Sequence, residues 1–252
     1  GKKAEELIIG VGRDSRLSGQ SLEHYLVEGL RSKNADVVLC SLATTPAMFM
    51  GTVFEQTHFD GSVMITASHL PFNRNGFKFF DKDGGLEHDD ITEILKEAAT
   101  QNPSGKSNIE NECGTFDLME LYSSHLRNAI INGLKFKSEK PLANLKIAVD
   151  AGNGAGGFFA EKVLKKLGAD ISGSCFLEPD GNFPNHIPNP ENKTAMESIK
   201  SAVLKSNSDL GLIFDTDVDR MSAVLSDGTE VNRDAIIAMT AAILAPNYPH
   251  ST

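Results

Sequence analysis

The stretch GSVMITASHLPFNRNGFKFF, residues 61–80, predicts two strands joined by a loop that could carry a functional site. Its first five residues form a short apolar run that is typical of a buried strand. Proline and Asn-Gly then signal turns, and residues 76–80 resume as a second strand with a polar residue among apolar ones. A buried strand therefore leads into a loop that carries Ser68 and His69. In α/β sheets, loops at strand ends of this kind hold ligands.

Strands and helices are predicted to alternate on both sides of this stretch. In the first half we expect strands at 7–12, 37–41, 61–65 and 76–80, and helices at 19–33, 46–57 and from 89 onward. A helix at 116–132 precedes the second half, where we expect strands at 145–150, 171–177, 210–214 and 222–227, and helices at 157–168 and 194–205. Both halves follow a β-α-β-α-β-β order. The prediction is an α/β fold of two similar mixed-sheet domains, with helices on both faces, that face a shared cleft.

A polar segment rich in Pro, Gly and Ser, TQNPSGKSN at 100–108, is typical of a linker. We therefore expect a first domain at 1–108, shortened at its N-terminus, and a second domain at 109–228. Residues 229–252 are expected to begin a third, truncated domain.

Composition narrows the function. The chain has 252 residues, 40% of them hydrophobic, and a formal net charge of −10, which disfavours a nucleic acid as partner. No apolar run approaches the roughly 20 residues that a membrane span needs. The three cysteines (Cys40, Cys113 and Cys175) are far apart and fit reduced thiols, so we expect a cytoplasmic protein or one of an organelle stroma.

Three aspartates follow the apolar strand LGLIF in the segment DTDVDR, 215–220. Alternate residues of an extended segment point the same way, so Asp215, Asp217 and Asp219 can converge on one hard cation such as Mg²⁺. An EF-hand is excluded because Arg220 stands at the sixth position, where that loop has glycine. A solvated acidic turn and an aspartyl phosphatase are the alternative interpretations.

A glycine-rich segment, DAGNGAGG at 150–157, matches G-x-G-x-x-G between a strand and a helix. A dinucleotide site would also need an acid at the end of the next strand, where the chain has Leu177-Glu178. The segment therefore favours a tight turn with close helix–strand packing over a nicotinamide site.

Cations gather on strand-end loops of this acidic chain: Arg13 and Arg16 follow the first strand, and Arg74 and Lys78 follow Ser68. Such a grouping suits a phosphate. No G-x-S-x-G segment occurs, so a hydrolase serine is not indicated.

Taken together, these segments resemble the α-D-phosphohexomutases, which comprise phosphoglucomutase, phosphomannomutase and phosphoglucosamine mutase. That family carries a serine loop T-A-S-H-N-P, a metal loop D-G-D-G-D-R, an early G-R-D-x-R and an N-G-x-K after the serine. The chain has TASHLP, DTDVDR, GRDSR and NGFK. TTP at 44–46 and DGNFPNHIPNP at 180–190 are further matches.

The resemblance implies a mutase that interconverts hexose 6-phosphate and hexose 1-phosphate through a phosphoserine at Ser68 and a hexose 1,6-bisphosphate intermediate. Arg16 and Arg220 would face the phosphate. Lys78, with His69 as second candidate, would move the proton of the sugar hydroxyl. Mg²⁺ would be held by the phosphorylated Ser68 together with Asp215, Asp217 and Asp219.

The chain departs from the family at Leu70, which replaces the asparagine of the serine loop, and at Thr216 and Val218, which replace two glycines of the metal loop. Because valine disfavours the backbone shapes that glycine allows, Val218 is expected to be extended or to shift the loop. These departures motivate an alternative, a catalytically impaired paralogue that binds sugar phosphate or a protein partner. The quoted motifs are common to all three kinds of mutase, and the family's sugar-reading loop G-E-x-S-G-H has no counterpart here.

Overall fold

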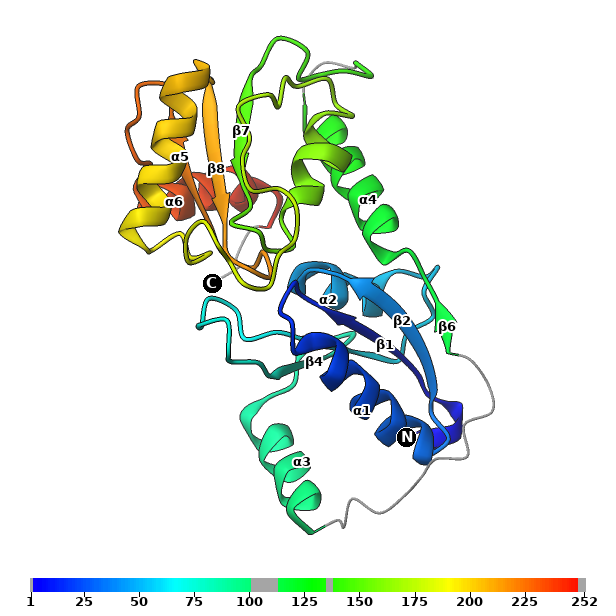
Figure 1. Ribbon diagram of the computed structural model, residues 1–252. Coiled ribbons are helices and arrows are strands. Elements are labelled where there is room, and N and C mark those ends of the chain that lie inside the picture. Colours follow the sequence, from blue (N-terminus) through cyan, green and yellow to red (C-terminus); the bar gives the residue numbers. More distant parts are fainter. Residues whose placement is uncertain (1, 101–112, 135–137, 249–252) are drawn as a thin grey trace.

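The computed structural model describes residues 2–100, 113–134 and 138–248, and it contains two β-sheets, each flanked by helices. In Figure 1 the first sheet lies below and the second above, with helix α4 (Leu118–Gly133) running upward beside them. Most of the expected linker, 100–108, falls outside the described residues. The expectation of a mixed α/β fold is confirmed.

The first sheet has six strands in the order β5-β4-β3-β1-β2-β6. The strands β1, β2, β3 and β6 are parallel, whereas β4 and β5 pair antiparallel at one edge. Their bounds are Ile8–Arg13 (β1), Asp36–Leu42 (β2), Gly61–Ile65 (β3), Phe77–Asp81 (β4), Gly84–Gly85 (β5) and Gly114–Thr115 (β6). The parallel strands β1 and β3 both end toward the loops that carry Arg16 and Ser68.

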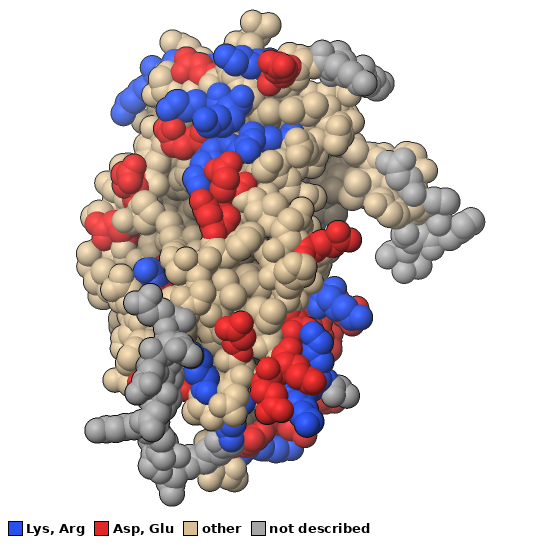
Figure 2. Space-filling model, turned by 90° about the vertical axis from the view of Figure 1, so that its right-hand side faces the viewer, with Lys and Arg blue, Asp and Glu red and all other residues tan. Residues whose placement is uncertain are grey.

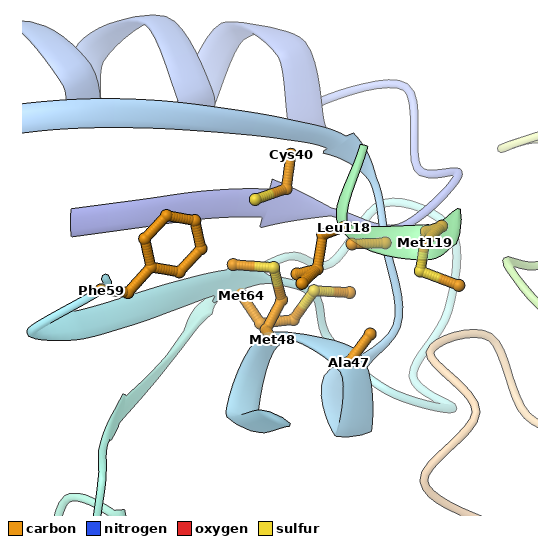
Figure 3. Packing of buried hydrophobic residues seen from close by; sticks show 8 residues of the cluster. Cys40, Ala47, Met48, Phe59, Met64, Leu118 and Met119 are labelled. Carbon is orange, nitrogen blue, oxygen red and sulfur yellow. The ribbon is translucent and has the colours of Figure 1, made fainter. Parts of the chain in front are cut away.

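Helices cover both faces of this sheet. Helix α1 (Gly19–Ser32) packs its leucines on one face, against Val11, Val37 and Ile65. Helix α2 (Thr45–Val53) packs on the other face, where Ala47 and Met48 meet Met64 and residues at the start of α4 (Figure 3). Helix α3 (His88–Thr100) follows β5.

The start of α2 is fixed by its sequence. Thr44 precedes the helix in an extended conformation, and its hydroxyl accepts a hydrogen bond from the amide of Ala47, 3.2 Å away. Proline stands in the first turn, where a missing N–H costs nothing. The first helical residue, Thr45, therefore has a defined place at the edge of the first sheet.

The second sheet has the order β7-β8-β9, with β7 (Ile147–Asp150) parallel to β8 (Leu210–Phe214) and β9 (Met221–Leu225) antiparallel. Helix α5 (Lys193–Ser206) packs on one face through alanine, methionine, isoleucine and valine. The π-helix Phe159–Leu164 packs on the other face. Two 3₁₀ turns (Ala4–Glu6 and Ala245–Asn247) and helix α6 (Arg233–Leu244) complete the described elements.

Two expected elements differ from the prediction. The segment 171–177 is not a strand, because within it only Cys175 forms an isolated bridge to β7, at Asp150. A turn interrupts it, in which the amide of Ser174 donates to the carbonyl of Ile171 over 2.9 Å. The helix expected at 157–168 forms, but its centre is the π-helix.

The surface carries charges of both signs. On the face shown in Figure 2, Lys and Arg side chains lie among Asp and Glu side chains, both in the upper and in the lower part of the view. Of the helices in the described ranges, none is both long and apolar enough for a membrane crossing.

Candidate active site

Ser68 lies in the loop between β3 and β4 and reaches the second sheet. Its backbone is left-handed, with φ of +51°, and its amide donates to the hydroxyl of Thr66 over 2.9 Å. Its own hydroxyl donates to Asp215 Oδ2 over 3.0 Å and accepts from Arg220 Nη2 over 2.6 Å. Asp215 and Arg220 belong to the other sheet's loop, so the predicted serine and the first predicted aspartate meet across the junction.

Arg16 holds the serine loop through hydrogen bonds to its main chain. Although it is an arginine, it is 1% exposed, and its Nε donates to the buried Asp14 over 3.1 Å. Its two terminal nitrogens donate to the main-chain carbonyl oxygens of Ser68, Leu70, Pro71 and Arg74. Five planar donors suit such a cluster of acceptors. The resemblance implies that Arg16 faces a phosphate; in the structure its Nε contacts Asp14 and its terminal nitrogens contact the loop backbone.

Asp14, the acidic partner of Arg16, joins the two strand-end loops. It accepts from the amide of Arg16 over 2.9 Å and from the hydroxyl of Thr66 over 2.8 Å. Burial raises the pKa of its carboxyl group, although these hydrogen bonds act in the opposite direction. The carboxyl group is therefore a structural link between the Arg16 turn and the Ser68 loop.

The three predicted aspartates converge. Asp215, Asp217 and Asp219 each offer a carboxylate oxygen, and these oxygens lie within 4.8 Å of one another. Asp215 and Asp217 are fully buried. Burial, followed by the negative charges of Asp217 and Asp219, raises the pKa of Asp215. Like charges held this close call for a cation, so the acidic cluster is a candidate metal site.

Val218 does not adopt the extended backbone that its side chain favours. Its φ is +64°, in the left-handed region, so the expectation of an extended conformation is wrong. Its amide donates to the carbonyl oxygen of Asp215 over 3.3 Å, and its side chain packs with the π-helix cluster. The loop thus keeps a backbone shape suited to glycine, and packing holds the valine in it.

Lys78, on β4, reaches the acidic cluster from the first sheet. Its Nζ lies 2.7 Å from Asp217 Oδ2 and 2.7 Å from Asp219 Oδ2. Partial burial lowers the pKa of Lys78, but the charges of the two aspartates and their hydrogen bonds outweigh it and raise the pKa overall. A protonated amine therefore stands beside the cluster.

Arg220 and His69 complete the contacts around the serine hydroxyl. Arg220 Nε lies 3.4 Å from Asp215 Oδ2 and 3.7 Å from Asp219 Oδ1. Its Nη2 is also hydrogen-bonded to His69 Nδ1, and that ring nitrogen is 3.5 Å from Ser68 Oγ. The imidazole therefore helps to hold the guanidinium against the serine.

Thr45 was noted in the sequence only as part of a matching TTP. In the structure its amide donates to the carbonyl oxygen of Asp217 over 2.9 Å, and its hydroxyl donates to Asp217 Oδ2. No spacing in the sequence links Thr45 to Asp217, because the contact depends on how the two sheets meet.

The glycine-rich turn supports the acidic loop and is filled by the chain itself. A Cβ on Gly154 would lie 2.7 Å from the carbonyl oxygen of Thr216, and one on Gly157 would lie 2.1 Å from that of Leu177. The amide of Ala155 donates to Thr216 O over 2.8 Å. The interpretation as a tight turn with close packing is confirmed.

The segment 180–190 connects the second sheet to the Arg16 turn. A Cβ on Gly181 would lie 2.4 Å from the carbonyl oxygen of Ser15, and the Phe183 ring lies over the Arg16 guanidinium with 5.4 Å to its centroid. His186 anchors the far end of this segment, at Asp150. The buried arginine is thus enclosed from both sheets.

The acidic cluster fits a divalent cation. Asp217 Oδ1 is buried, and among the described residues it has no hydrogen-bond partner. An unpartnered buried carboxylate oxygen costs free energy unless something else binds it. Three carboxylates with a serine oxygen alongside form the all-oxygen donor set that Mg²⁺ prefers.

Comparisons with known proteins point to one family. Family models described as phosphoglucomutase/phosphomannomutase α/β/α domains I and II match residues 1–106 and 120–228. A phosphoglucomutase of Neisseria gonorrhoeae is 35% identical over 236 residues, which are 92% of this chain and 48% of the relative. A phosphoglucosamine mutase of Caldicellulosiruptor bescii is 33% identical over 238 residues, covering 92% of this chain and 50% of the relative.

A solved structure has the same fold. The phosphoglucomutase/phosphomannomutase family protein of Burkholderia thailandensis superposes with a TM-score of 0.79 at 28% identity, covering 97% of this chain and 54% of that one. The chain spans about half the length of the curated relatives that it matches. It belongs to the phosphoglucomutase/phosphomannomutase family, whose domains I and II it matches.

Proposed function

We propose that this chain forms the phosphoserine and metal-binding part of a phosphohexomutase that interconverts hexose 6-phosphate and hexose 1-phosphate. The observation that carries the proposal is the 3.0 Å contact between Ser68 Oγ and Asp215 Oδ2, which joins a nucleophile from the first sheet to the acidic cluster of the second. Curated relatives named phosphoglucomutase and phosphoglucosamine mutase support the choice of substrate class.

In the proposed reaction, a sugar hydroxyl attacks the phosphorus of phosphorylated Ser68, and the bond between phosphorus and Ser68 Oγ breaks. The sugar hydroxyl loses a proton and Ser68 gains one. Lys78 is the proposed proton carrier, with His69 as second candidate, because Lys78 contacts the acidic cluster and His69 lies beside the serine hydroxyl. Reorientation of the hexose 1,6-bisphosphate and return of its other phosphoryl group to Ser68 complete the isomerisation.

Positive charge is needed where phosphoryl oxygens gather. Arg220 already donates to Ser68 Oγ and is the proposed phosphate ligand. Arg16 is proposed to act one step away, by fixing the serine loop through its main-chain carbonyls. A Mg²⁺ ion bound by Asp215, Asp217, Asp219 and an oxygen on Ser68 would offset charge in the transition state.

The remaining assignments extend this proposal. The division into domains at 1–108 and 109–228, with a third beginning at 229, is proposed from the presence of two sheets, although strand β6 of the first sheet (Gly114–Thr115) lies beyond residue 108. A cytoplasmic location is proposed from the free thiols of the described cysteines.

The proposal is tested by phosphoryl transfer to the protein. The protein is incubated with glucose 1,6-bisphosphate and Mg²⁺, and intact mass and peptide mapping then locate any added phosphoryl group. We expect one group, on Ser68. Ser68→Ala should gain none, whereas Ser226→Ala, which alters an exposed serine, should be labelled like the wild type. A protein that folds and binds Mg²⁺ but gains no phosphoryl group would favour the impaired paralogue.

A further inference from the structure

We infer that Thr45 is a positioning residue for the metal site, and that it acts through Asp217. The inference rests on the proposed function and deepens it, since it names a residue of the first sheet that sets the affinity of an ion held by the second. Thr45 touches neither the serine nor the other two aspartates in any contact that the described residues show.

Thr45 binds Asp217 at both its main chain and its side chain. The amide of Thr45 donates to the carbonyl oxygen of Asp217 over 2.9 Å, and the hydroxyl of Thr45 donates to Oδ2 of the same residue. Two bonds to one residue fix both the path of the backbone and the rotamer of the carboxylate. The Asp217 side chain therefore cannot turn without breaking a buried hydrogen bond.

The hydroxyl also decides which oxygen remains for an ion. Asp217 Oδ2 accepts from Thr45 and from Lys78 Nζ, which lies 2.7 Å away. Asp217 Oδ1 is buried without a hydrogen-bond partner in the described residues, and the carboxylate oxygens of the cluster lie within 4.8 Å of one another. With Oδ2 engaged from the first sheet, Oδ1 is the oxygen left to the metal. Partners of this kind, which orient a ligand without touching the ion, typically change metal affinity by about 10–100-fold.

The helix that carries Thr45 is capped at its start and is packed against the first sheet. Thr45 is 8% exposed and is the first residue of α2, whose capping residue Thr44 bonds the amide of Ala47. Ala47 and Met48 are fully buried against the sheet, as Figure 3 shows. The amide of Thr45 belongs to the first turn of α2, where free N–H groups and the helix dipole favour a negative partner. The loop of the second sheet that carries Asp217 therefore contacts a packed helix of the first sheet.

The test measures binding of Mn²⁺ alone, without substrate, by electron paramagnetic resonance of the free ion. Thr45→Val keeps the side-chain shape and removes the hydroxyl, and we expect it to weaken Mn²⁺ binding by about tenfold or more. Thr45→Ser restores the hydroxyl and should return the affinity to within about threefold of the wild type, since an intact second partner keeps the ligand oriented.

Thr52→Val is the matched control. Thr52 is on the same helix, is 9% exposed, and donates to the carbonyl oxygens of Phe49 and Asp81, far from the cluster. We expect it to lower the free energy of unfolding and to leave Mn²⁺ affinity unchanged. A purely structural Thr45 would behave in the same way.

The outcomes separate the two proposals. If the wild type binds Mn²⁺ and Thr45→Val binds it equally well, the positioning role is wrong and the proposed function stands. Failure of Thr45→Ser to restore binding also overturns the positioning role. If the folded wild-type protein binds no Mn²⁺, the proposed metal site itself fails, and the inference fails with it.

Discussion

His186 Nε2 lies 3.0 Å from Asp150 Oδ1, in a pair whose side chains are 2% and 0% exposed. Asp150 ends β7, and it also accepts from the hydroxyl of Ser198 on α5 over 2.7 Å. The pair ties the segment 180–190 to the second sheet, while Phe183 of that segment covers Arg16. The arginine that holds the serine loop is therefore kept in place from the opposite sheet.

This pair makes stability depend on pH. Burial favours neutral His186, but the hydrogen bond to Asp150 and its charge raise the pKa of His186 above its ordinary value of 6.5. Its stabilising contribution is therefore complete below pH 6.5 and is lost as pH rises through the raised pKa. We expect His186→Gln to lower the free energy of unfolding by about 3 kcal/mol at low pH, and by less at high pH.

Urea denaturation at pH 6 and pH 9 measures the effect. His24→Gln, on the exposed side of α1, is the control and should change stability by less than about 0.5 kcal/mol at either pH. A cost of His186→Gln that does not fall with rising pH would contradict a charged histidine.

Val218 offers a test of backbone strain. At its φ of +64°, glycine should be better tolerated than alanine, so Val218→Gly should be more stable than Val218→Ala by about 1 kcal/mol. At Val224, a fully buried residue of β9, the order should reverse by a similar amount. Thermal denaturation of the four variants gives both differences. If alanine is the better residue at both positions, the left-handed assignment is wrong.

Arg16→Lys should loosen the serine loop. A lysine cannot reach all the carbonyl oxygens and Asp14 at once, and we expect a loss of about 3 kcal/mol in the free energy of unfolding. Hydrogen exchange should rise at the amides of Ser68 and Leu70. Arg127→Lys alters a half-buried arginine that bonds Lys162 O and Glu120, and it should cost less than about 1 kcal/mol. Unchanged hydrogen exchange at these amides in Arg16→Lys would show that Arg16 does not hold the serine loop in place.

Asp217→Asn should abolish stabilisation by a divalent ion. At a Mg²⁺ concentration of 100 times the dissociation constant, the wild type should gain about 2.7 kcal/mol. The variant lacks one carboxylate of the cluster and should gain little at the same concentration. Asp227→Asn, at an exposed acid that caps a turn, should respond like the wild type. Calorimetry with and without Mg²⁺ measures the gain, and an equal gain in Asp217→Asn would contradict the assignment of the ligand.

Much of the fold was predictable because strong local patterns carried it. The helix expected at 19–33 is α1, Gly19–Ser32, and the strand expected at 210–214 is β8. The prediction of a strand at 171–177 was wrong because polar side chains there take the place of main-chain partners in the sheet. Asp170 Oδ1 accepts from the amide of Ser172 over 2.8 Å, and the hydroxyl of Ser174 accepts from the amide of Val149 over 2.9 Å. The sequence of the segment does not show whether its polar side chains will bond to the backbone in this way.

In the candidate site, too, the residues that belong to sequence motifs were predictable, whereas contacts that depend on the tertiary fold were not. The sequence analysis named Ser68 and the three aspartates, because motifs place each at the end of a strand, and the structure brings them together. It noted Thr45 only within a matching TTP, because the contact of Thr45 with Asp217 depends on where two separate sheets meet. The family resemblance implies that Arg16 faces a phosphate, and this stays a prediction; the carbonyl oxygens of the serine loop around its side chain could not be read from the sequence.

The contacts between Thr45 and Asp217 and between Ser68 and Asp215 have an evolutionary consequence, because each joins residues far apart in the gene. An exchange of one half between distant relatives would bring together facing residues that had not changed together. We therefore expect the effect of a substitution at one of these residues to depend on the residue that faces it in the other half.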